Sequence, residues 1–374
     1  MSTHAASTQV REASRSGRSL RIVAGGRWLD AGRPVHAIGT LSVAGDRGIV
    51  EYVPGDLTLT ARAGTPVAEL VAAVKSNDQW LPLDPWGGDS GTLGATISTA
   101  TAGPHAHAMG QPRDVVLGME FVSGAGDVIR AGGRVVKNVA GFDLTRLLIG
   151  SWGTLGVVTE VTLRLRARPA RLGSFVMEVA DGSDALNRLA ISLRSLPFTP
   201  MAAEVVNGDL ARRLGVATST TLLVRVGGNT SSVGAQIAAL ETLGRVQDAP
   251  ADIWRRLRES DVERPASWRC SGLPSAFGDT WSAVERGTDR ADRPPPMVHG
   301  SPFRGVVRVL ANGDPASIGR TIARGNTIAI EKLPAEAYAT IPSVNTGNER
   351  LARRLRDTFD PHGILNPGIM GAMA

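Results

Sequence analysis

The sequence predicts an α+β protein made of two domains, and three observations support this prediction. The chain has 374 residues, a length that favours two domains of ordinary size over one. Between Arg21 and Arg168, short apolar segments are separated by glycines, whereas from Leu172 onward longer strand-like and helix-like segments alternate. Hydrophobic residues make up 42% of the chain, so both regions can bury a core.

The first predicted domain spans residues 19–169 and follows a tail, residues 1–18, that is small, polar and expected to be frayed. Leu57–Ala63 alternates apolar and polar residues with period two, which predicts a strand. Residues 65–78 carry apolar side chains at helical spacing, with Thr65 as the expected N-cap. The other predicted elements are a helix over residues 141–153 and a strand over residues 157–169.

The second predicted domain, residues 170–345, alternates strands with helices and is expected to form a compact α+β sandwich. Strands are predicted over residues 174–180, 221–228, 305–312 and 327–334, and helices, each opened by a serine cap, over residues 183–196 and 231–244. Residues 285–303 are rich in proline and charge and predict an exposed loop. Residues 346–374 predict a helix and a turn-rich tail that packs on the first domain.

The charge and cysteine content excludes several classes of function. The formal net charge is +6, but 35 acidic residues are scattered among the basic ones and only 4% of residues are aromatic, which argues against nucleic-acid binding. The single cysteine, Cys270, cannot form an internal disulfide and cannot build a zinc or iron–sulfur site alone. No apolar run suits a signal peptide or a membrane span, so we expect a reducing, cytoplasmic compartment.

Glycine, which occupies 44 positions, is the most informative residue type. The sequence lacks the P-loop, the GxGxxG fingerprint, the HExxH motif and the GxSxG motif. Four glycine-bearing clusters remain: residues 24–27, 91–104, 110–114 and 150–156. Because glycine lets backbone N–H groups converge on an anion, the four clusters together favour a binding site for the pyrophosphate of a dinucleotide. Each cluster taken alone predicts only a turn between strands.

The stretch from Gly91 to Arg168 resembles the FAD-binding domain of the vanillyl-alcohol-oxidase type, also called the PCMH type. More narrowly, GGRVVKNVAGFDLTRLLIGSWGTLGVVTEVTLRLRARP resembles the E-subunit family of glycolate oxidase, a multi-subunit 2-hydroxy-acid dehydrogenase. The match continues at residues 48–70 and 359–370, and weakly at residues 267–277. The resemblance implies a two-subdomain FAD-binding domain, a smaller α+β cap domain and a C-terminal tail that returns to the flavin domain.

The resemblance also implies which residues bind FAD. Gly25, Gly26 and Arg27 would donate backbone hydrogen bonds to the pyrophosphate, residues 156–158 would contact the adenine–ribose half, and Asn366 would lie near the isoalloxazine. The pyrophosphate loop contains no histidine of the kind that attaches flavin covalently, so non-covalent FAD is expected. The full set of implied FAD-binding residues is Ala24, Gly25, Gly26, Arg27, Trp28, Pro85, Thr92, Leu93, Gly94, Ala95, Ser98, Thr99, Gly103, Gly110, Arg113, Asp114, Gly156, Val157, Val158 and Asn366.

Oxidation of a 2-hydroxy acid requires a hydride acceptor, a base for the hydroxyl proton and a cation for the carboxylate. The candidate base is His299, which could equally face water in its proline-rich segment. The candidate cations are Arg269 and Arg308, because a guanidinium binds a carboxylate through two hydrogen bonds, although a chain so rich in arginine offers many alternatives. Lys137 is conspicuous in a chain with only three lysines, and it could serve the site or the surface.

Two functions remain open. In the first, the chain is the catalytic FAD subunit of a glycolate-type dehydrogenase. In the second, it carries FAD as an assembly or electron-relay subunit without its own substrate turnover. The resemblance implies a larger FAD subunit and an iron–sulfur subunit as partners, with at most peripheral membrane association through them. His105 and His107 form an HxH pair, but no third ligand is evident, so no metal site is predicted.

Overall fold

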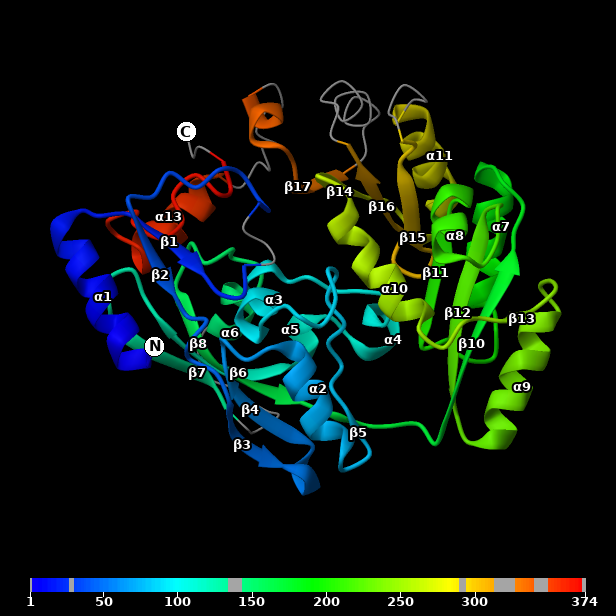
Figure 1. The fold of residues 1–374 in the computed structure, drawn as a ribbon, viewed down its shortest axis with the longest axis horizontal. Coiled ribbons are helices and arrows are strands. Elements are labelled where there is room, and N and C mark those ends of the chain that lie inside the picture. The colour runs from blue at the N-terminus through cyan, green and yellow to red at the C-terminus, as the bar shows by residue number, and fades with distance from the viewer. Residues whose placement is uncertain are drawn as a thin grey trace. The chain divides into compact units, whose positions relative to one another are not determined.

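The computed structural model describes residues 2–26, 30–133, 143–288, 294–312, 327–339 and 349–371. The fold is α+β, as the sequence predicts, and the chain divides into two compact units (Figure 1). Unit 1 comprises residues 1–103, 110–168 and 342–374, and unit 2 comprises residues 104–109 and 169–341. The boundary between residues 168 and 169 lies close to Leu172, where the longer strand-like and helix-like segments begin in the sequence.

The centre of unit 1 is a five-stranded antiparallel sheet in the order β3-β4-β8-β6-β7. Its strands are β3 (Ile49–Val53), β4 (Thr58–Arg62), β6 (Val116–Val122), β7 (Val128–Gly132) and β8 (Val157–Arg164). Phe121 and Val158 face a core that includes α2 (Val67–Lys75) and α3 (Leu93–Thr99). Their neighbours Val122 and Val157 face a second core, so both sides of the sheet are covered.

The second core includes the helix α1 (Thr3–Ser16), so the expectation of a frayed tail was wrong. Ser2 caps this helix by accepting a hydrogen bond from the N–H of Ala5 at 3.3 Å. Ala6, Val10 and Ala13 form a narrow apolar stripe that is buried on the sheet. Small side chains hide this stripe in the sequence, because alanine contributes little to apparent hydrophobicity.

Three expected helix caps lie elsewhere. Thr65 hydrogen-bonds the backbone of Gly48 instead of capping α2, which begins after Pro66. The hydroxyl of Ser183 donates to the carboxylate of Asp279, and α7 (Ser183–Arg194) is preceded by a glycine. The cap of α9 (Thr230–Glu241) is Asn229, whose side chain accepts from the N–H of Ser232 at 2.8 Å. In each case a tertiary partner or a better local acceptor replaced the predicted cap.

A short parallel pair, β1 (Leu20–Val23) with β2 (Gly39–Ser42), stands beside the main sheet of unit 1. The other edge of β1 forms a parallel bridge between Leu20 and Leu365 of the C-terminal tail. This tail follows α13 (Glu349–Phe359) and belongs to unit 1, where the sequence analysis placed it. The shorter elements of unit 1 are η1 (Pro54–Asp56), β5 (Gln79–Trp80), α5 (Pro112–Val115), α6 (Leu144–Leu148) and β9 (Arg166–Ala167).

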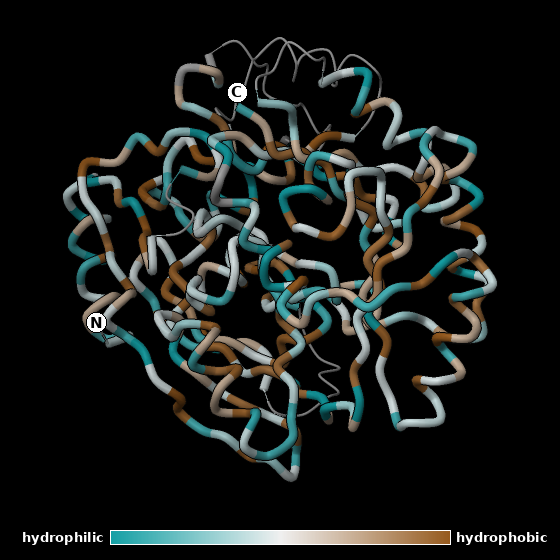
Figure 2. Tube along the Cα trace, turned by 45° about the vertical axis from the view of Figure 1, so that its right-hand side comes forward, coloured by the Kyte–Doolittle hydropathy of each residue, from teal (hydrophilic) through white to brown (hydrophobic). Residues whose placement is uncertain are grey.

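Unit 2 is built on an antiparallel sheet whose described strands follow the order β13-β10-β12-β11-β15-β16-β14-β17. These strands are β10 (Arg171–Glu178), β11 (Ala202–Val206), β12 (Thr221–Gly228), β13 (Gln247–Asp248), β14 (Ala266–Ser271), β15 (Met297–Ser301), β16 (Val306–Ala311) and β17 (Thr327–Lys332). One face carries an apolar core that includes residues of α7, α9 and α11 (Phe277–Gly287). Along the chain the hydropathy colours change repeatedly between brown and pale or teal (Figure 2).

The other face of this sheet is covered by α10 (Ile253–Glu259) and η2 (Ser260–Glu263). The indole N–H of Trp254 on α10 donates to the hydroxyl of Ser174 on β10 at 2.9 Å. The remaining elements of unit 2 are α4 (Ala106–Met109), α8 (Gly208–Leu214), η3 (Pro274–Ala276) and η4 (Ala335–Ala339). None of the helices in the described ranges is both long and apolar enough to cross a membrane.

The expectation of an exposed loop over residues 285–303 was wrong for much of that range. Helix α11 continues to Gly287, and all five residues of β15 are buried between β11 and β16. The sequence of β15 contains His299, Gly300 and Ser301, which do not resemble an interior strand. Within the sheet, the buried imidazole of His299 has an internal partner, because its Nδ1 lies 3.1 Å from Oε2 of Glu204.

Candidate functional site

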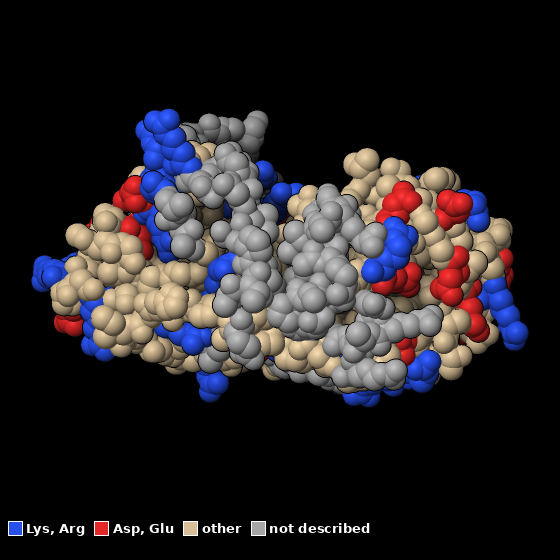
Figure 3. Space-filling model, turned by 90° about the horizontal axis from the view of Figure 1, so that it is seen from above, with Lys and Arg blue, Asp and Glu red and all other residues tan. Residues whose placement is uncertain are grey.

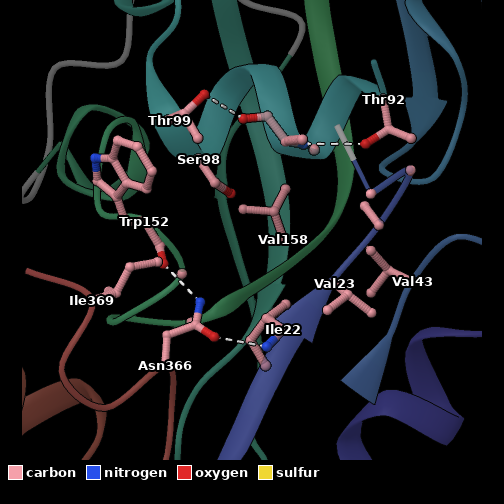
Figure 4. Close-up of a pocket in the computed structure, with 17 residues that line it drawn as sticks. Ile22, Val23, Val43, Thr92, Ser98, Thr99, Trp152, Val158, Asn366 and Ile369 are labelled. Carbon is pink, nitrogen blue, oxygen red and sulfur yellow. Dashed lines mark hydrogen bonds between the residues drawn. The ribbon is translucent and has the colours of Figure 1, made fainter. Parts of the chain in front are cut away.

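A pocket in unit 1 is assembled from four stretches of chain that are distant in the sequence (Figure 4). They are β1 with the loop that follows it, α3, the turn that leads into β8, and the C-terminal tail. Val43, just after β2, completes the wall beside β1. The lining residues are Ile22, Val23, Ala24, Gly25, Gly26, Val43, Thr92, Gly94, Ala95, Ser98, Thr99, Trp152, Gly153, Gly156, Val158, Asn366 and Ile369.

The loop after β1 presents backbone donors to this pocket. The N–H groups of Gly25 and Gly26 have no hydrogen-bond acceptor among the described residues. Gly26 adopts a φ of +80°, which a residue without Cβ takes at little cost. A Cβ on Gly25 would lie 3.1 Å from the methyl group of Thr92, so glycine lets the loop pack against the start of α3. The arrangement suits an anion that is bound by main-chain N–H groups.

Helix α3 forms a second wall. The hydroxyl of Thr92 accepts from the N–H of Ala95 and thereby begins the helix. The hydroxyl of Thr99 donates back to the carbonyl of Ala95 at 2.7 Å, whereas that of Ser98 has no partner among the described residues (Figure 4). A Cβ on Gly94 would lie 2.8 Å from Cβ of Ala63 on the sheet side, so this glycine lets the helix approach the sheet closely.

Asn366 in the tail joins two other walls. Its Oδ1 accepts from the N–H of Ile22 at 2.7 Å, and its Nδ2 donates to the carbonyl of Trp152 at 2.8 Å (Figure 4). The residue is 4% exposed and has a φ of +44°, a conformation that asparagine tolerates better than most residues. The tail therefore contributes structurally to the pocket although it lies far from β1 in the sequence.

Many of the residues implied by the resemblance meet at this pocket. Those that line it are Ala24, Gly25, Gly26, Thr92, Gly94, Ala95, Ser98, Thr99, Gly156, Val158 and Asn366. Arg27 and Trp28 lie outside the described residues. Contact between these residues and a cofactor remains a prediction.

The other implied residues are not among those that line the pocket. Leu93 and Val157 are buried in the two cores of unit 1, and Pro85 is also buried. A Cβ on Gly103 would overlap the carbonyl oxygen of Asp84, so that glycine serves close packing. The remaining three are Gly110, Arg113 and Asp114; the last caps the start of α5 through the N–H of Gln111 at 2.9 Å.

The sequence analysis missed several lining residues, namely Ile22, Val23, Val43, Trp152, Gly153 and Ile369. Trp152 and Gly153 belong to the fourth glycine cluster, so that cluster was a usable signal for them. Nothing in the local sequence of Val43 or Ile369 marks them as pocket residues. They reach the pocket only because β2 pairs with β1 and the tail runs along β1.

The pocket fits a flavin dinucleotide by its chemistry. The backbone N–H groups of Gly25 and Gly26, which have no acceptor in the described part of the chain, suit the pyrophosphate, and the aliphatic walls from Ile22, Val43 and Val158 suit flat apolar rings. The hydroxyl of Ser98 is a further donor. No charged side chain occurs among the described lining residues, so recognition of an anion there depends on main-chain groups.

The catalytic candidates in unit 2 lie in one row across its sheet. His299 on β15 stands opposite Arg308 on β16, which in turn stands opposite Arg269 on β14. Residues directly opposite each other share a face, so all three point to the side covered by α10 and η2. Glu204 on β11 lies on this same face.

His299 is 1% exposed, and its Nδ1 lies 3.1 Å from Oε2 of Glu204. Complete burial, with the positive charge of Arg308 as the second cause, lowers the pKa of His299 to about 3. The imidazole is therefore neutral near pH 7. A base with so low a pKa is poorly matched to abstraction of a hydroxyl proton, which is most efficient when the pKa of the base lies near the working pH.

Arg308 is 2% exposed and is bound by two carboxylates. Its Nη2 lies 2.7 Å from Oδ1 of Asp261 on η2, and its Nε donates to Oε2 of Glu331 on β17 at 2.5 Å. Burial alone would lower the pKa of Arg308, but Asp261 and Glu331 more than offset this and raise it. Burial raises the pKa of Asp261 even beside this arginine. The guanidinium charge is thus balanced within the chain.

A strand irregularity explains how Glu331 reaches this position. The register between β14 and β17 shifts between Ser267 and Trp268, so Glu331 has no direct partner on β14. Its Oε1 lies 3.7 Å from Nε of Arg269, whose side chain is 43% exposed. Arg269 is therefore the most accessible of the three candidates in this row. Lys137 lies outside the described residues.

The HxH pair belongs to unit 2 and its two rings have separate partners. Nε2 of His105 lies 3.2 Å from Nη1 of Arg225. Nε2 of His107 lies 2.8 Å from the carbonyl of Pro200, and its ring stacks on Phe303 with centroids 4.5 Å apart. Across the described ranges, no group of three or more His, Cys, Asp or Glu side chains could hold a metal ion.

Basic and acidic side chains are interspersed on the face of the molecule shown in Figure 3. The helix α13, for example, carries the exposed residues Arg350, Arg353 and Arg354 beside Asp357.

Comparison with known proteins agrees with the chemistry of the pocket. Residues 2–132 match the family model described as FAD binding domain. The chain is 33% identical over 355 residues to glycolate oxidase subunit GlcE of Escherichia coli (strain K12), which covers 91% of this chain and 89% of that protein. It is 31% identical over 210 residues to glycolate oxidase subunit GlcD of Bacillus subtilis (strain 168), which covers 54% of this chain and 44% of that protein.

Solved structures show the same fold at low sequence identity. p-Cresol methylhydroxylase with substrate bound has a TM-score of 0.75 and 15% identity, covering 99% of this chain and 87% of that chain. The 4-ethylphenol oxidase from Gulosibacter chungangensis has a TM-score of 0.71 and 16% identity, covering 99% and 88%. The fold and the matching family model thus define a flavoprotein with a PCMH-type FAD-binding domain, and FAD is its cofactor. Within that class, the chain belongs to the family of glycolate oxidase subunit GlcE.

Proposed function

We propose that the chain is the FAD-binding subunit of a complex that oxidises small 2-hydroxy acids of the glycolate type and passes the electrons to a partner. When bound, FAD supplies the acceptor for the hydride on C2 of the acid. The names of the relatives support this class of reaction, since they include glycolate oxidase subunits and D-2-hydroxyglutarate and D-lactate dehydrogenases. The observation that carries the proposal is the pocket of unit 1, where the N–H groups of Gly25 and Gly26 have no acceptor among the residues that the structure describes.

We also propose that FAD is held without a covalent bond. The described residues that line the pocket include no histidine, cysteine or tyrosine that could attack the flavin ring. Denaturation of the purified protein in acid should therefore release all of the flavin into the supernatant. Flavin that stays with the precipitated chain would contradict this part of the proposal.

If the chain turns over substrate itself, Arg269 is the best candidate among the described residues for the substrate carboxylate. Its side chain is 43% exposed and its carboxylate neighbour Glu331 lies at 3.7 Å, so the guanidinium keeps donors for a ligand. Arg308 and His299 are less suitable, because both are buried and engaged by carboxylates of the same chain. Lys137 remains a proposed contributor from the sequence alone.

A second candidate function is favoured by the burial of His299 and Arg308 and by their pairing with carboxylates of the same chain. In it the chain carries FAD for assembly or electron relay, and a larger FAD subunit performs the oxidation with an iron–sulfur subunit as acceptor. The pKa of His299 is low, and Arg308 is balanced by Asp261 and Glu331, so these two residues do not provide a base and a free cation together. This candidate and the first share the flavin site and differ only in where substrate is turned over.

One experiment separates the two candidates. The chain is purified alone, its visible spectrum is recorded, and glycolate or D-lactate is added anaerobically, with dithionite as a control for complete reduction. Flavin absorption at about 450 nm that bleaches with the acid supports turnover in this chain. Absorption that bleaches only with dithionite supports the second candidate. A colourless protein that does not take up added FAD would refute both.

A further inference from the structure

The C-terminal residues 364–371, which we call the clasp, contact the chain on both sides of the loop that follows β1 and carries Gly25 and Gly26. We call this loop the cofactor loop. The N–H of Leu20 donates to the carbonyl of Ile364 at 2.7 Å, and the N–H of Asn366 donates to the carbonyl of Leu20 at 2.9 Å. Ile364 and Leu365 are 1% and 0% exposed and lie in the core formed with α1. The clasp therefore extends β1 on the edge opposite to β2.

The clasp also binds the chain beyond the cofactor loop. The N–H of Arg33 donates to the carbonyl of Ile369 at 2.9 Å, and the N–H of His36 donates to the carbonyl of Pro367 at 2.9 Å. A Cβ on Gly32 would lie 2.7 Å from Cγ1 of Ile369, so these segments are in close contact. Both ends of the loop that carries Gly25 and Gly26 are thus fastened to the same short tail.

Asn366 is the residue of the clasp that connects this loop with the opposite wall of the pocket. Its carboxamide bridges the N–H of Ile22 and the carbonyl of Trp152, as described above. The amide nitrogen packs directly over Gly153, where a Cβ would lie only 2.8 Å from Nδ2. Any larger residue at position 153 would displace the amide. The close fit indicates that the bridge is a specific feature of the pocket.

We infer that Asn366 is a positioning residue that couples docking of the C-terminal clasp to binding of FAD. It acts through Ile22 and Trp152, which it holds at the spacing seen in the pocket, and the inference requires no direct contact with the cofactor. If a docked clasp raises the affinity for FAD, then bound FAD stabilises the docked clasp by the same factor. The inference rests on FAD binding in this pocket and is independent of which acid is oxidised.

The test compares the wild-type chain with Asn366→Asp. This substitution keeps the size of the side chain, a conformation that tolerates positive φ and the acceptor for Ile22, but it turns an oxygen toward the carbonyl of Trp152. The FAD dissociation constant, measured by quenching of flavin fluorescence, should rise about tenfold or more. The control is Asn229→Asp, the same change at the cap of α9 in unit 2, which should leave the constant within about twofold.

A second measurement needs no substitution. Trypsin can cleave after the arginines of α13, which directly precedes the clasp and is tied to it by a hydrogen bond from Arg356 to the carbonyl of Leu365 at 3.4 Å. Added FAD should slow this cleavage in the wild-type chain, and the protection should be weaker in Asn366→Asp. Equal FAD affinity in the two chains, or absence of FAD-dependent protection in a wild-type chain that binds FAD, would overturn the inference. A wild-type chain that binds no FAD would overturn the proposed function as well.

Discussion

Arg308→Met is the substitution whose consequence can be worked out most fully from the structure. Methionine has a similar length but no charge, so the change leaves Asp261 buried without its cation. The side chain of Asp261 is 7% exposed, and Nη2 of Arg308 lies 2.7 Å from its carboxylate. Glu331 is better placed, because its side chain is 16% exposed and Nε of Arg269 lies 3.7 Å from it. The loss of unfolding free energy is therefore expected to come mainly from Asp261.

Asp261 can escape an uncompensated charge by taking up a proton. Protonation of the carboxylate costs about 1.4 kcal/mol for each pH unit between the ordinary pKa of aspartate and the pH of the solution. Because the pKa of Asp261 is already raised in the wild-type chain, the ordinary pKa of 3.8 gives an upper limit for the loss of unfolding free energy, which is about 4 kcal/mol at pH 7 and about 2 kcal/mol at pH 5. The upper limit at pH 7 lies within the roughly 3–5 kcal/mol observed when one partner of a buried ion pair is removed.

The assay is urea denaturation at pH 7 and pH 5, followed by the fluorescence of tryptophans in unit 2 such as Trp254 and Trp268. The double variant Asp261→Asn with Arg308→Met removes both charges and should recover about half or more of the lost stability at pH 7. A loss for Arg308→Met that is below about 1 kcal/mol, or equal at the two pH values, would refute the buried ion pair. Bleaching by glycolate in the double variant would show in addition that Arg308 does not hold the substrate carboxylate.

Three further predictions follow from the same contacts. Gly26→Asp should weaken FAD binding about a hundredfold, because it places a carboxylate at the pyrophosphate. Gly26→Asn is neutral and tolerates a φ of +80°, so this variant should bind FAD at least about tenfold more tightly than the aspartate variant. Equal affinities of the two variants in flavin fluorescence titrations would show that the loop does not face the pyrophosphate. The pKa of His299 is about 3 in the native chain, so below pH 6.5 the imidazole takes up a proton in the unfolded chain but not in the native chain. The free energy of unfolding should therefore be about 2 kcal/mol lower at pH 5 than at pH 8. His299→Gln should remove this pH dependence of stability in urea denaturation. Burial raises the pKa of Cys270 to about 12, so a thiol reagent should modify the native chain at least about a hundredfold more slowly than the urea-unfolded chain; comparable rates would contradict its burial.

The glycine clusters show how far the sequence could lead toward the site. Glycine adopts conformations that other residues avoid and lets backbones approach closely, so the sequence marks certain glycines as functional candidates. Those that line the pocket are Gly25, Gly26, Gly94 and Gly156. Gly103 is equally conspicuous in the sequence, yet it serves packing against Asp84. The two uses of glycine look alike in one dimension, so the sequence predicts a site without separating its members from their structural neighbours.

The elements were predictable where periodicity is strong and were missed where partners are tertiary. The strand β4 and the helix α2 follow their patterns closely. The helix α1 was missed because its stripe consists mainly of alanines, and β15 was missed because His299, Gly300 and Ser301 do not resemble the sequence of an interior strand. His299 lies on that strand and was expected in a loop. Its burial, which lowers its pKa, was therefore invisible before the fold was known.

The sequence by itself determined the class of the protein, its cofactor chemistry and most of the residues on the walls nearest the glycine clusters, because these depend on local conformation and short motifs. Only the tertiary structure decided which distant segments complete the pocket and which charges are already balanced. Asn366 meets Ile22 across 344 positions of the chain, and Arg308 on β16 meets Asp261 on η2. Such contacts form only when strands pair and segments distant in the sequence pack together, and no local pattern encodes them.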